Sequence, residues 1–166
     1  MSKDLFVFAE GDWIVHLYHG VGQIQTIESK CLDGKTCNYY KVITQDSTFW
    51  VPVEETENNR IRPLSSPREF KQALRILKRN PRQMNPDHSA RKERIKEVMA
   101  GGDLRAIARL VRDMAARQAE ARLNDSEERA FNRFLDRFLA EWSACSGITR
   151  EEARLKLMGI FQELHI

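Results

Sequence analysis

The chain of 166 residues has no long apolar run, few cysteines and few histidines. No stretch approaches the roughly 20 consecutive apolar residues that a membrane-spanning helix needs. The first twelve residues, MSKDLFVFAEGD, carry acids early and no long apolar segment, so we expect no signal peptide and a cytoplasmic protein. With 31% charged and 42% hydrophobic residues, the composition is that of a globular chain with one or two small domains.

The three cysteines, Cys31, Cys37 and Cys145, argue against a disulfide framework because their number is odd. Cys31 and Cys37 flank Asp33-Gly34 and could face each other across a hairpin. We interpret them as two reduced thiols on neighbouring strands rather than as a redox pair. No CxxC motif supplies the ligand spacing of a zinc site, so we expect no metal.

The sequence also lacks the signatures of catalysis. It has no GxSxG elbow and no GxxxxGK[ST] phosphate loop. His16 and His19 stand three residues apart near a predicted strand end, where packing explains them better than a site. Paired acids such as Glu54-Glu55 lie at the ends of predicted elements, where solvent or a helix dipole favours them. We therefore expect no enzyme and no cofactor.

Residues 11–53 are rich in β-branched and aromatic side chains, separated by turn residues. They predict four short strands, at roughly 12–16, 22–29, 39–44 and 48–53. Gly20 and Gly22 allow the sharp curl of a barrel corner, and Asp33-Gly34 is a strong hairpin signal. So small a barrel has little room for a buried site, so we expect its edge strand or outer face to dock a partner.

The composition changes near residue 63 to Ala, Leu, Arg and Glu at helical spacing. Ser66, Pro67 and Glu69 have the arrangement of a capping box that starts the first helix. Further helices are predicted at about 86–100, from Asp103 to about 123, to about 144 and to about 164. The sequence thus predicts an α+β protein with a β domain at 5–63 and a bundle of about five helices at 67–164.

Charge is distributed unevenly along the chain. Residues 1–63 have a net charge of −3, residues 125–166 have −2, and residues 68–122, with 15 basic and 7 acidic side chains, have +8. A basic block of this kind is the footprint expected of a surface that contacts phosphates. Solvated helix faces built with arginine, a good helix former, explain the block equally well.

Several of the residues named above belong to a larger pattern. It comprises Gly11, Asp12, Val15, His19-Gly20-Val21-Gly22, Ile24, Ile27-Glu28, Gly34, Tyr39, Val51-Pro52-Val53 and Ile61-Arg62. This pattern resembles the RNA-polymerase-interacting domain shared by CarD/CdnL-type bacterial transcription regulators and the transcription-repair coupling factor. The likeness continues at Gly102-Asp103-Leu104, Ala108, Leu110-Val111-Arg112-Asp113-Met114, Leu123, Ser126-Glu127 and Arg129. Without a phosphate loop or room for a motor, the chain is closer to CarD/CdnL than to the repair factor.

For the β domain, the resemblance implies a Tudor-like bent barrel that docks on the β subunit of bacterial RNA polymerase by edge-strand pairing. The residues assigned to this contact are Lys30, Tyr39, Phe49, Trp50, Val51 and Pro52. Trp50 stands where the family often has an arginine, which predicts a more apolar contact. An alternative is that Trp50 only covers the exposed end of the sheet.

For the helical domain, the resemblance implies that the second helix meets promoter DNA at the upstream edge of the transcription bubble. The residues assigned to this contact are His88, Arg91, Lys92, Arg94 and Lys96. The position of the family's wedge tryptophan falls at His88, whose smaller ring makes a weaker wedge. Three alternatives stay open: His88 is the wedge, Met84 takes its place, or the chain has no wedge. Glu93 adds an acid among the bases.

These features together predict a monomeric transcription regulator associated with the nucleoid through RNA polymerase. It contacts upstream promoter DNA without reading sequence and stabilises the open complex. One alternative is an adaptor that binds polymerase through the β domain and another protein through its helices. A second is a free-standing nucleic-acid-binding module.

Overall fold

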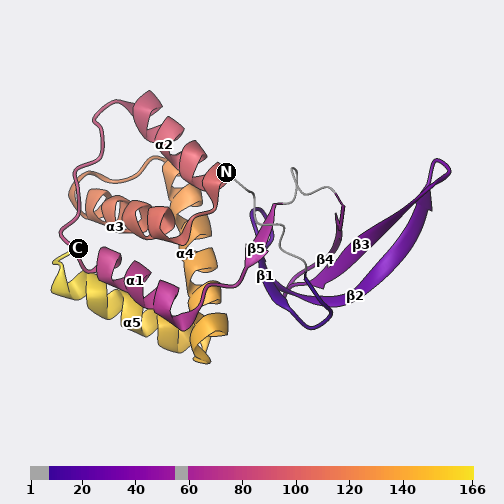
Figure 1. The fold of residues 1–166 in the computed structure, drawn as a ribbon. Helices are drawn as coiled ribbons and strands as arrows, with labels where there is room; N and C mark the ends of the chain where they lie inside the picture. Colours follow the sequence, from indigo (N-terminus) through magenta and orange to yellow (C-terminus); the bar gives the residue numbers. More distant parts are fainter. Residues whose placement is uncertain (1–7, 55–59) are drawn as a thin grey trace. The chain divides into compact units, whose positions relative to one another are not determined.

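The computed structural model describes residues 8–54 and 60–166 of the chain. They form two compact units, which meet in sequence between Leu64 and Ser65 and have separate hydrophobic cores. Five strands are followed by five helices in the described residues (Figure 1), which confirms the α+β class. None of the helices described is long and apolar enough to cross a membrane.

The first unit is an antiparallel sheet. Its strands are β1 (Trp13–His16), β2 (Gly20–Leu32), β3 (Lys35–Ile43), β4 (Thr48–Pro52) and β5 (Ile61–Pro63). Their order is β4-β3-β2-β1-β5, so β4 and β5 lie at opposite edges and the described sheet is open. The expected Tudor-like bent barrel is, in the described residues, a bent antiparallel sheet that does not close. The short β5 was not predicted, because three residues that end in a proline carry no alternating pattern.

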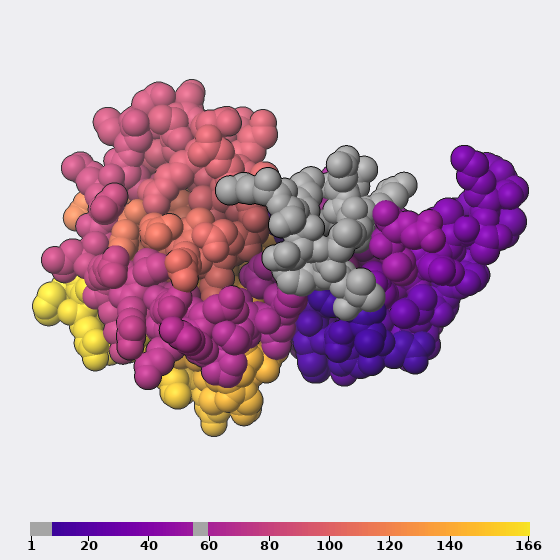
Figure 2. Space-filling model, viewed as in Figure 1, coloured from indigo at the N-terminus to yellow at the C-terminus, as the bar shows by residue number. Residues whose placement is uncertain are grey.

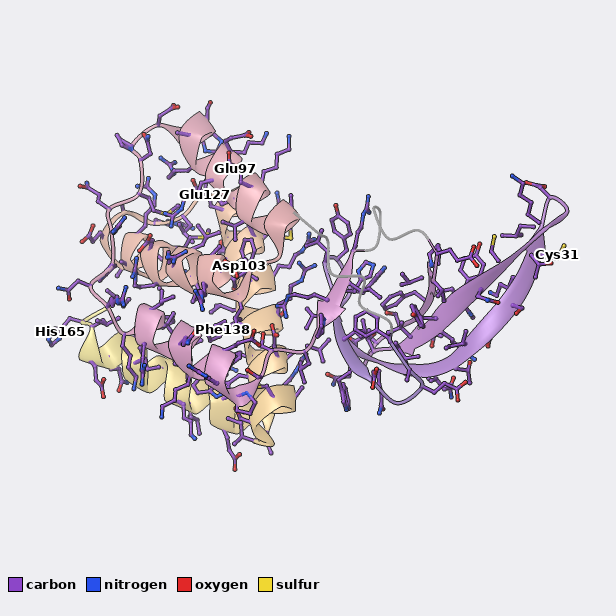
Figure 3. The ribbon with its side chains drawn as sticks, viewed as in Figure 1. Cys31, Glu97, Asp103, Glu127, Phe138 and His165 are labelled. Carbon is purple, nitrogen blue, oxygen red and sulfur yellow. The ribbon has the colours of Figure 1, made fainter. Side chains whose placement is uncertain are left out.

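The β2–β3 hairpin is longer than the sequence predicted. Asp33 and Gly34 have φ values of 50° and 77°, the positive values that a type I′ turn requires. Such a two-residue turn lets the strands pair without interruption up to Leu32 and Lys35. Cys31, at the far end of the hairpin (Figure 3), is opposite Thr36, whereas Cys37 is opposite Lys30.

Adjacent positions of a strand point to opposite faces, so Cys31 and Cys37 lie on different faces of the hairpin. A bond between them is excluded by this register, and all three cysteines of the chain are free thiols.

The inner face of the sheet carries the core of the first unit. The buried residues are Phe8, Ile14, Ile24, Tyr40, Val42, Val51 and Ile61. Gly22 belongs to this face, and a Cβ at this position would stand 2.7 Å from Val42 Cγ1 and 3.0 Å from the Ile43 carbonyl oxygen. Gly20 has a different role, because its φ of 78° lies in the left-handed region at the β1–β2 turn. The two glycines of the motif thus meet separate steric requirements.

Replacement of Gly22 by alanine is expected to destabilise the sheet unit by about 1–3 kcal/mol, because the new methyl group overpacks the core against Val42. Scanning calorimetry would show a lower transition temperature for this unit. Gly101→Ala is the control, since a Cβ there meets no atom within 4 Å. Equal transition temperatures for Gly22→Ala and the unmodified protein would contradict the expectation.

The second unit consists of α1 (Pro67–Leu77), α2 (His88–Gly101), α3 (Leu104–Ala121), α4 (Asp125–Ser146) and α5 (Arg150–Glu163). Each begins after a residue whose side chain accepts a backbone hydrogen bond, in order Ser66, Asp87, Asp103, Asn124 and Thr149. The predicted capping box at Ser66 and Glu69 is present. The second helix begins two residues later than predicted, because Asp87 is its N-cap.

The helices enclose a core of aliphatic and aromatic side chains in which α3 is the most deeply buried helix. Phe70 of α1 packs on Phe138 and Trp142 of α4, with ring centroids 4.9 and 5.6 Å away. Such aromatic contacts add to the free energy of simple burial. They join α1 to α4 through residues that are more than 60 positions apart in the sequence.

A buried carboxylate ties α3 to its surroundings. Asp113, 1% exposed, accepts hydrogen bonds from the Arg82 backbone N–H and Arg112 Nε at 2.9 Å and from Arg94 Nη2 at 2.8 Å. Arg112 Nη1 also donates to the Ile76 carbonyl, 3.2 Å away. These bonds connect the end of α1, the following loop and α2 to α3.

Asp113→Asn is expected to destabilise the helical unit by roughly 3 kcal/mol, because the buried Arg112 guanidinium then lacks a compensating charge. Urea unfolding followed by helical circular dichroism measures the change. The exposed Asp136 of α4 provides the control Asp136→Asn, which should leave stability almost unchanged. Similar losses in the two variants would show that the Asp113 charge has no special role.

Candidate functional site

The pleat of the sheet divides the six residues predicted to contact polymerase between two faces. Val51 is buried in the core, and Phe49 packs against that core from the same face. Lys30, Tyr39, Trp50 and Pro52 belong to the other face, because the register sets Trp50 opposite Lys41 and Pro52 opposite Tyr39. We call this the outer hairpin face and include Glu28 and Lys41, which the same register places there.

Trp50 is the centre of the outer hairpin face. Its side chain is 41% exposed, and its indole Nε1–H donates to Glu28 Oε2 at 2.9 Å. Lys30 Nζ lies 3.8 Å from the centroid of the Trp50 ring, and Lys41 Nζ lies 3.8 Å from Glu28 Oε1. Hydrogen bonding and cation–π contact therefore orient a large exposed ring before any partner binds, which lowers the entropy lost on binding.

The contacts around Trp50 lower the pKa of the Glu28 carboxyl group. The hydrogen bond from Trp50 is the main influence that lowers the pKa of the Glu28 carboxyl, and the nearby charges of Lys41 and Lys30 lower it further. A lowered pKa favours the carboxylate, so the contact with Trp50 is fully present above the ordinary glutamate pKa of 4.5. The contact weakens as the pH falls through the lowered value.

The outer hairpin face adjoins the edge strand β4 of the described sheet. Val53 N–H donates to the Asn38 carbonyl, and Thr44 N–H donates to the Ser47 carbonyl, both at 2.9 Å. In an antiparallel pair the hydrogen-bonded positions alternate, so Thr48 and Trp50 direct their backbone groups away from β3. Among the described strands none pairs with this edge of β4. An added strand is thus able to bond to β4 beside the Trp50 ring.

The two neighbouring histidines have a packing role. His16, 8% exposed, accepts hydrogen bonds at Nδ1 from the backbone N–H groups of Tyr18 and His19, at 3.0 and 3.1 Å. The His19 ring stacks on Phe49 with centroids 4.3 Å apart. Within residues 8–54 and 60–166, no three His, Cys, Asp or Glu side chains are grouped to hold a metal ion.

His88, the position of the predicted wedge, is the first residue of α2, and 54% of its side chain is exposed. Its Nδ1 lies 3.2 Å from the Asn124 side-chain amide nitrogen and 3.7 Å from Glu127 Oε1. The N-terminus of α4 therefore holds one side of the ring and leaves the rest to solvent.

Two of the arginines predicted to contact DNA are engaged within the bundle. Arg91 is 7% exposed, bonds through Nε to Glu127, which lies beside α2 (Figure 3), and donates to two carbonyls of the preceding loop. Burial raises the pKa of Glu127, but hydrogen bonds from Arg91 and the Asn124 N–H outweigh it and lower the pKa overall. Arg94 is paired with Asp113. Arg91 in particular has almost no surface left for a phosphate.

The remaining bases of α2, Lys92 and Lys96, are exposed. They alternate with Glu93 and Glu97, which are exposed as well. The exposed face of α2 therefore carries two acids for its two lysines, and its charge is close to zero when His88 is neutral.

The sequence argument overlooked Glu28 and Lys41 on the outer hairpin face. The Asp33-Gly34 turn could have located Glu28, because a two-residue hairpin loop sets Glu28 opposite Tyr39. The neighbour of Lys41 on β4 depends on the irregular β3–β4 connection, for which the sequence carries no register signal.

The indole N–H resonance of Trp50 is expected to titrate with an apparent pKa below 4.5, because protonation of Glu28 weakens the bond that it accepts. Proton–nitrogen correlation spectra recorded from neutral to acidic pH measure this shift. Glu28→Gln keeps an acceptor but cannot ionise, so its Trp50 resonance should not move in that range. A titration that persists in Glu28→Gln would assign the effect to another group.

Comparison with known proteins agrees with this arrangement of two units. Residues 8–65 match the family model described as CarD-like/TRCF RID domain, and residues 72–158 match the one described as CarD, C-terminal domain. A Bacillus subtilis (strain 168) protein with the name "Putative transcription factor YdeB" is 24% identical over 150 residues, which cover 89% of this chain and 98% of the relative. The chain belongs to the CarD family of transcription regulators linked to RNA polymerase.

Proposed function

We propose that this protein binds the β subunit of bacterial RNA polymerase through its sheet unit and stabilises the promoter open complex. The observation that carries the proposal is the preorganised Trp50 ring on the edge strand β4, where Thr48 and Trp50 direct backbone groups away from β3. An added strand supplies main-chain hydrogen bonds, and an aromatic anchor next to it supplies buried area and specificity. Lys30 and Lys41 add positive charge around the ring, which suits a partner edge with acidic side chains.

Of the six residues first assigned to this contact, the proposal keeps Lys30, Tyr39, Trp50 and Pro52. They lie together on the outer hairpin face, beside the edge strand β4 or on it. Phe49 and Val51 support the contact indirectly, because they pack the opposite face of the same strand into the core.

The helical unit is proposed to contact upstream promoter DNA without reading its sequence, with His88 nearest to the transcription bubble. More than half of the His88 side chain is exposed, so the ring is able to stack on a distorted base step. Contacts made only in the open complex shift the equilibrium toward it, and a tenfold shift needs about 1.4 kcal/mol.

Trp50→Ala is expected to weaken binding to the isolated β subunit by roughly 2 kcal/mol, about thirtyfold, as loss of an aromatic hot spot does. Trp13→Ala is the matched control, because Trp13 is also exposed in the same unit, at 49%, but lies on β1 away from the β4 edge. Binding is measured by interferometry with immobilised β subunit. Equal affinities for the two variants would refute the docking surface.

The same variants, with His88→Ala added, are then compared for the lifetime of an open complex formed with cognate polymerase. Wild type should prolong the lifetime, and Trp50→Ala should abolish that effect. Loss of the effect in His88→Ala with intact polymerase binding would support the bubble contact. A wild-type lifetime like that of polymerase alone would refute open-complex stabilisation while leaving docking to be judged by the binding data.

A second candidate function is that of a polymerase-bound adaptor for another protein. It is favoured by Leu155 and Met158 of α5, which are 61% and 48% exposed and lie one turn apart on the helix. An adaptor would bind polymerase through Trp50 but would have no salt-dependent affinity for DNA.

A further inference from the structure

A basic groove lies where the end of α1, the loop after it and α3 meet. It has a volume of about 570 Å³ and is lined by Ile76, Lys78, Arg79, Asn80, Arg82, Arg109 and Arg112. We use the name basic groove for this set. Figure 1 shows α1 and α3 side by side, and Figure 2 shows both on the same face of the helical unit.

The positive charge extends from the basic groove along α1. A second hollow of about 310 Å³ is lined by Arg68, Lys71, Gln72 and Arg75. Arg68, Lys71, Arg75 and Lys78 recur every three or four residues, so they lie along one side of the helix. At 1.5 Å per residue this row is about 15 Å long, which matches the rise of roughly four base pairs along the axis of a DNA duplex.

The cations of the basic groove are available to a ligand. In the described part of the chain, the side chains of Lys78, Arg79, Arg82 and Arg109 make no hydrogen bond or ion pair, and no described residue that lines either hollow is acidic. The nearby carboxylate of Glu69 is engaged as the capping acceptor of Ser66 N–H. The exposed face of α2, by contrast, has an acid for each lysine.

The Asp113 cluster gives the groove a defined shape. Arg112 donates to the Ile76 carbonyl, and the Arg82 backbone N–H donates to Asp113. Both ends of the loop that carries Lys78 and Arg79 are therefore bonded to α3, which also supplies Arg109.

We propose that the basic groove and the cationic row along α1 bind the phosphate backbone of double-stranded DNA and provide the main electrostatic contact of the helical unit. This inference rests on the proposed function and assigns its DNA contact to a different surface from α2. An open surface with charges along about 15 Å fits an extended polyanion better than a small ligand. Among the described residues that line the two hollows there is no aromatic ring on which unpaired bases could stack, which favours duplex over single strands.

The test measures fluorescence anisotropy of full-length protein with a 30-base-pair duplex of arbitrary sequence over a series of salt concentrations. The variant Lys78→Gln/Arg79→Gln/Arg109→Gln removes three exposed cations of the groove. Its slope of log K against log salt should be shallower by about 3, and its affinity at low salt should fall roughly tenfold or more. Circular dichroism verifies that each variant is folded.

Two other variants complete the set. Arg129→Gln/Arg133→Gln/Arg154→Gln removes the same charge from exposed positions of α4 and α5 that line neither hollow, and it should keep most of the wild-type slope. Lys92→Gln/Lys96→Gln tests α2 in the same way. If the α2 variant loses DNA binding and the groove variant does not, the groove assignment is wrong while the proposed DNA contact stands.

Further outcomes separate the remaining possibilities. If the groove variant and the α4–α5 control lose the same amount of DNA affinity, the effect comes from the overall charge of the protein, and the inference is overturned. Tighter, groove-dependent binding of single-stranded RNA of the same length would overturn the assignment to duplex DNA. If wild type shows no salt-dependent DNA binding, both the groove assignment and the proposed DNA contact fall, whereas polymerase docking is judged separately by the Trp50→Ala measurement.

Discussion

The arrangement of α2 and of the loop after α1 around α3 depends on one buried carboxylate, that of Asp113. It receives hydrogen bonds from the backbone after α1, from α2 and from its own helix α3. A buried charge is tolerated only when it is compensated, so three segments are held where their donors reach it. Two consequences for function follow. Arg94 is paired with Asp113 and is less available to an external anion. The loop that carries Lys78 and Arg79 is held against α3.

In the sheet unit the corresponding constraint is the pleat. Because neighbouring residues point to opposite faces, each turn residue that sets the register also decides which side chains are exposed. Val51 fills the core, and Trp50 beside it meets Glu28 and Lys30 on the outer hairpin face. One short edge strand thereby carries both a stabilising and an accessible residue. The backbone groups of Thr48 and Trp50, which point away from β3, add a second means of contact at the same place.

Electrostatics explains why basic residues that are neighbours in sequence have different roles. Arg91 is enclosed with Glu127 because α2 packs its first turn against the start of α4. The bases of α1 face outward and have no acidic partners in the described residues, since the buried side of α1 is formed by Phe70, Ala73, Ile76 and Leu77. The net charge of a segment is therefore a poor guide to the charge of its surface. What matters is which cations the fold pairs internally.

The sequence alone determined the features that depend on neighbouring residues. The α+β class, the Asp33-Gly34 turn, the capping box at Ser66 and the family pattern all follow from local chemistry that a few adjacent residues complete. Only the tertiary structure decided that the sheet stays open, that β5 exists, that Arg91 is buried and that Arg109 joins Lys78 in one groove. Each of these depends on partners distant in the chain, and no local periodicity or propensity encodes which distant partners meet.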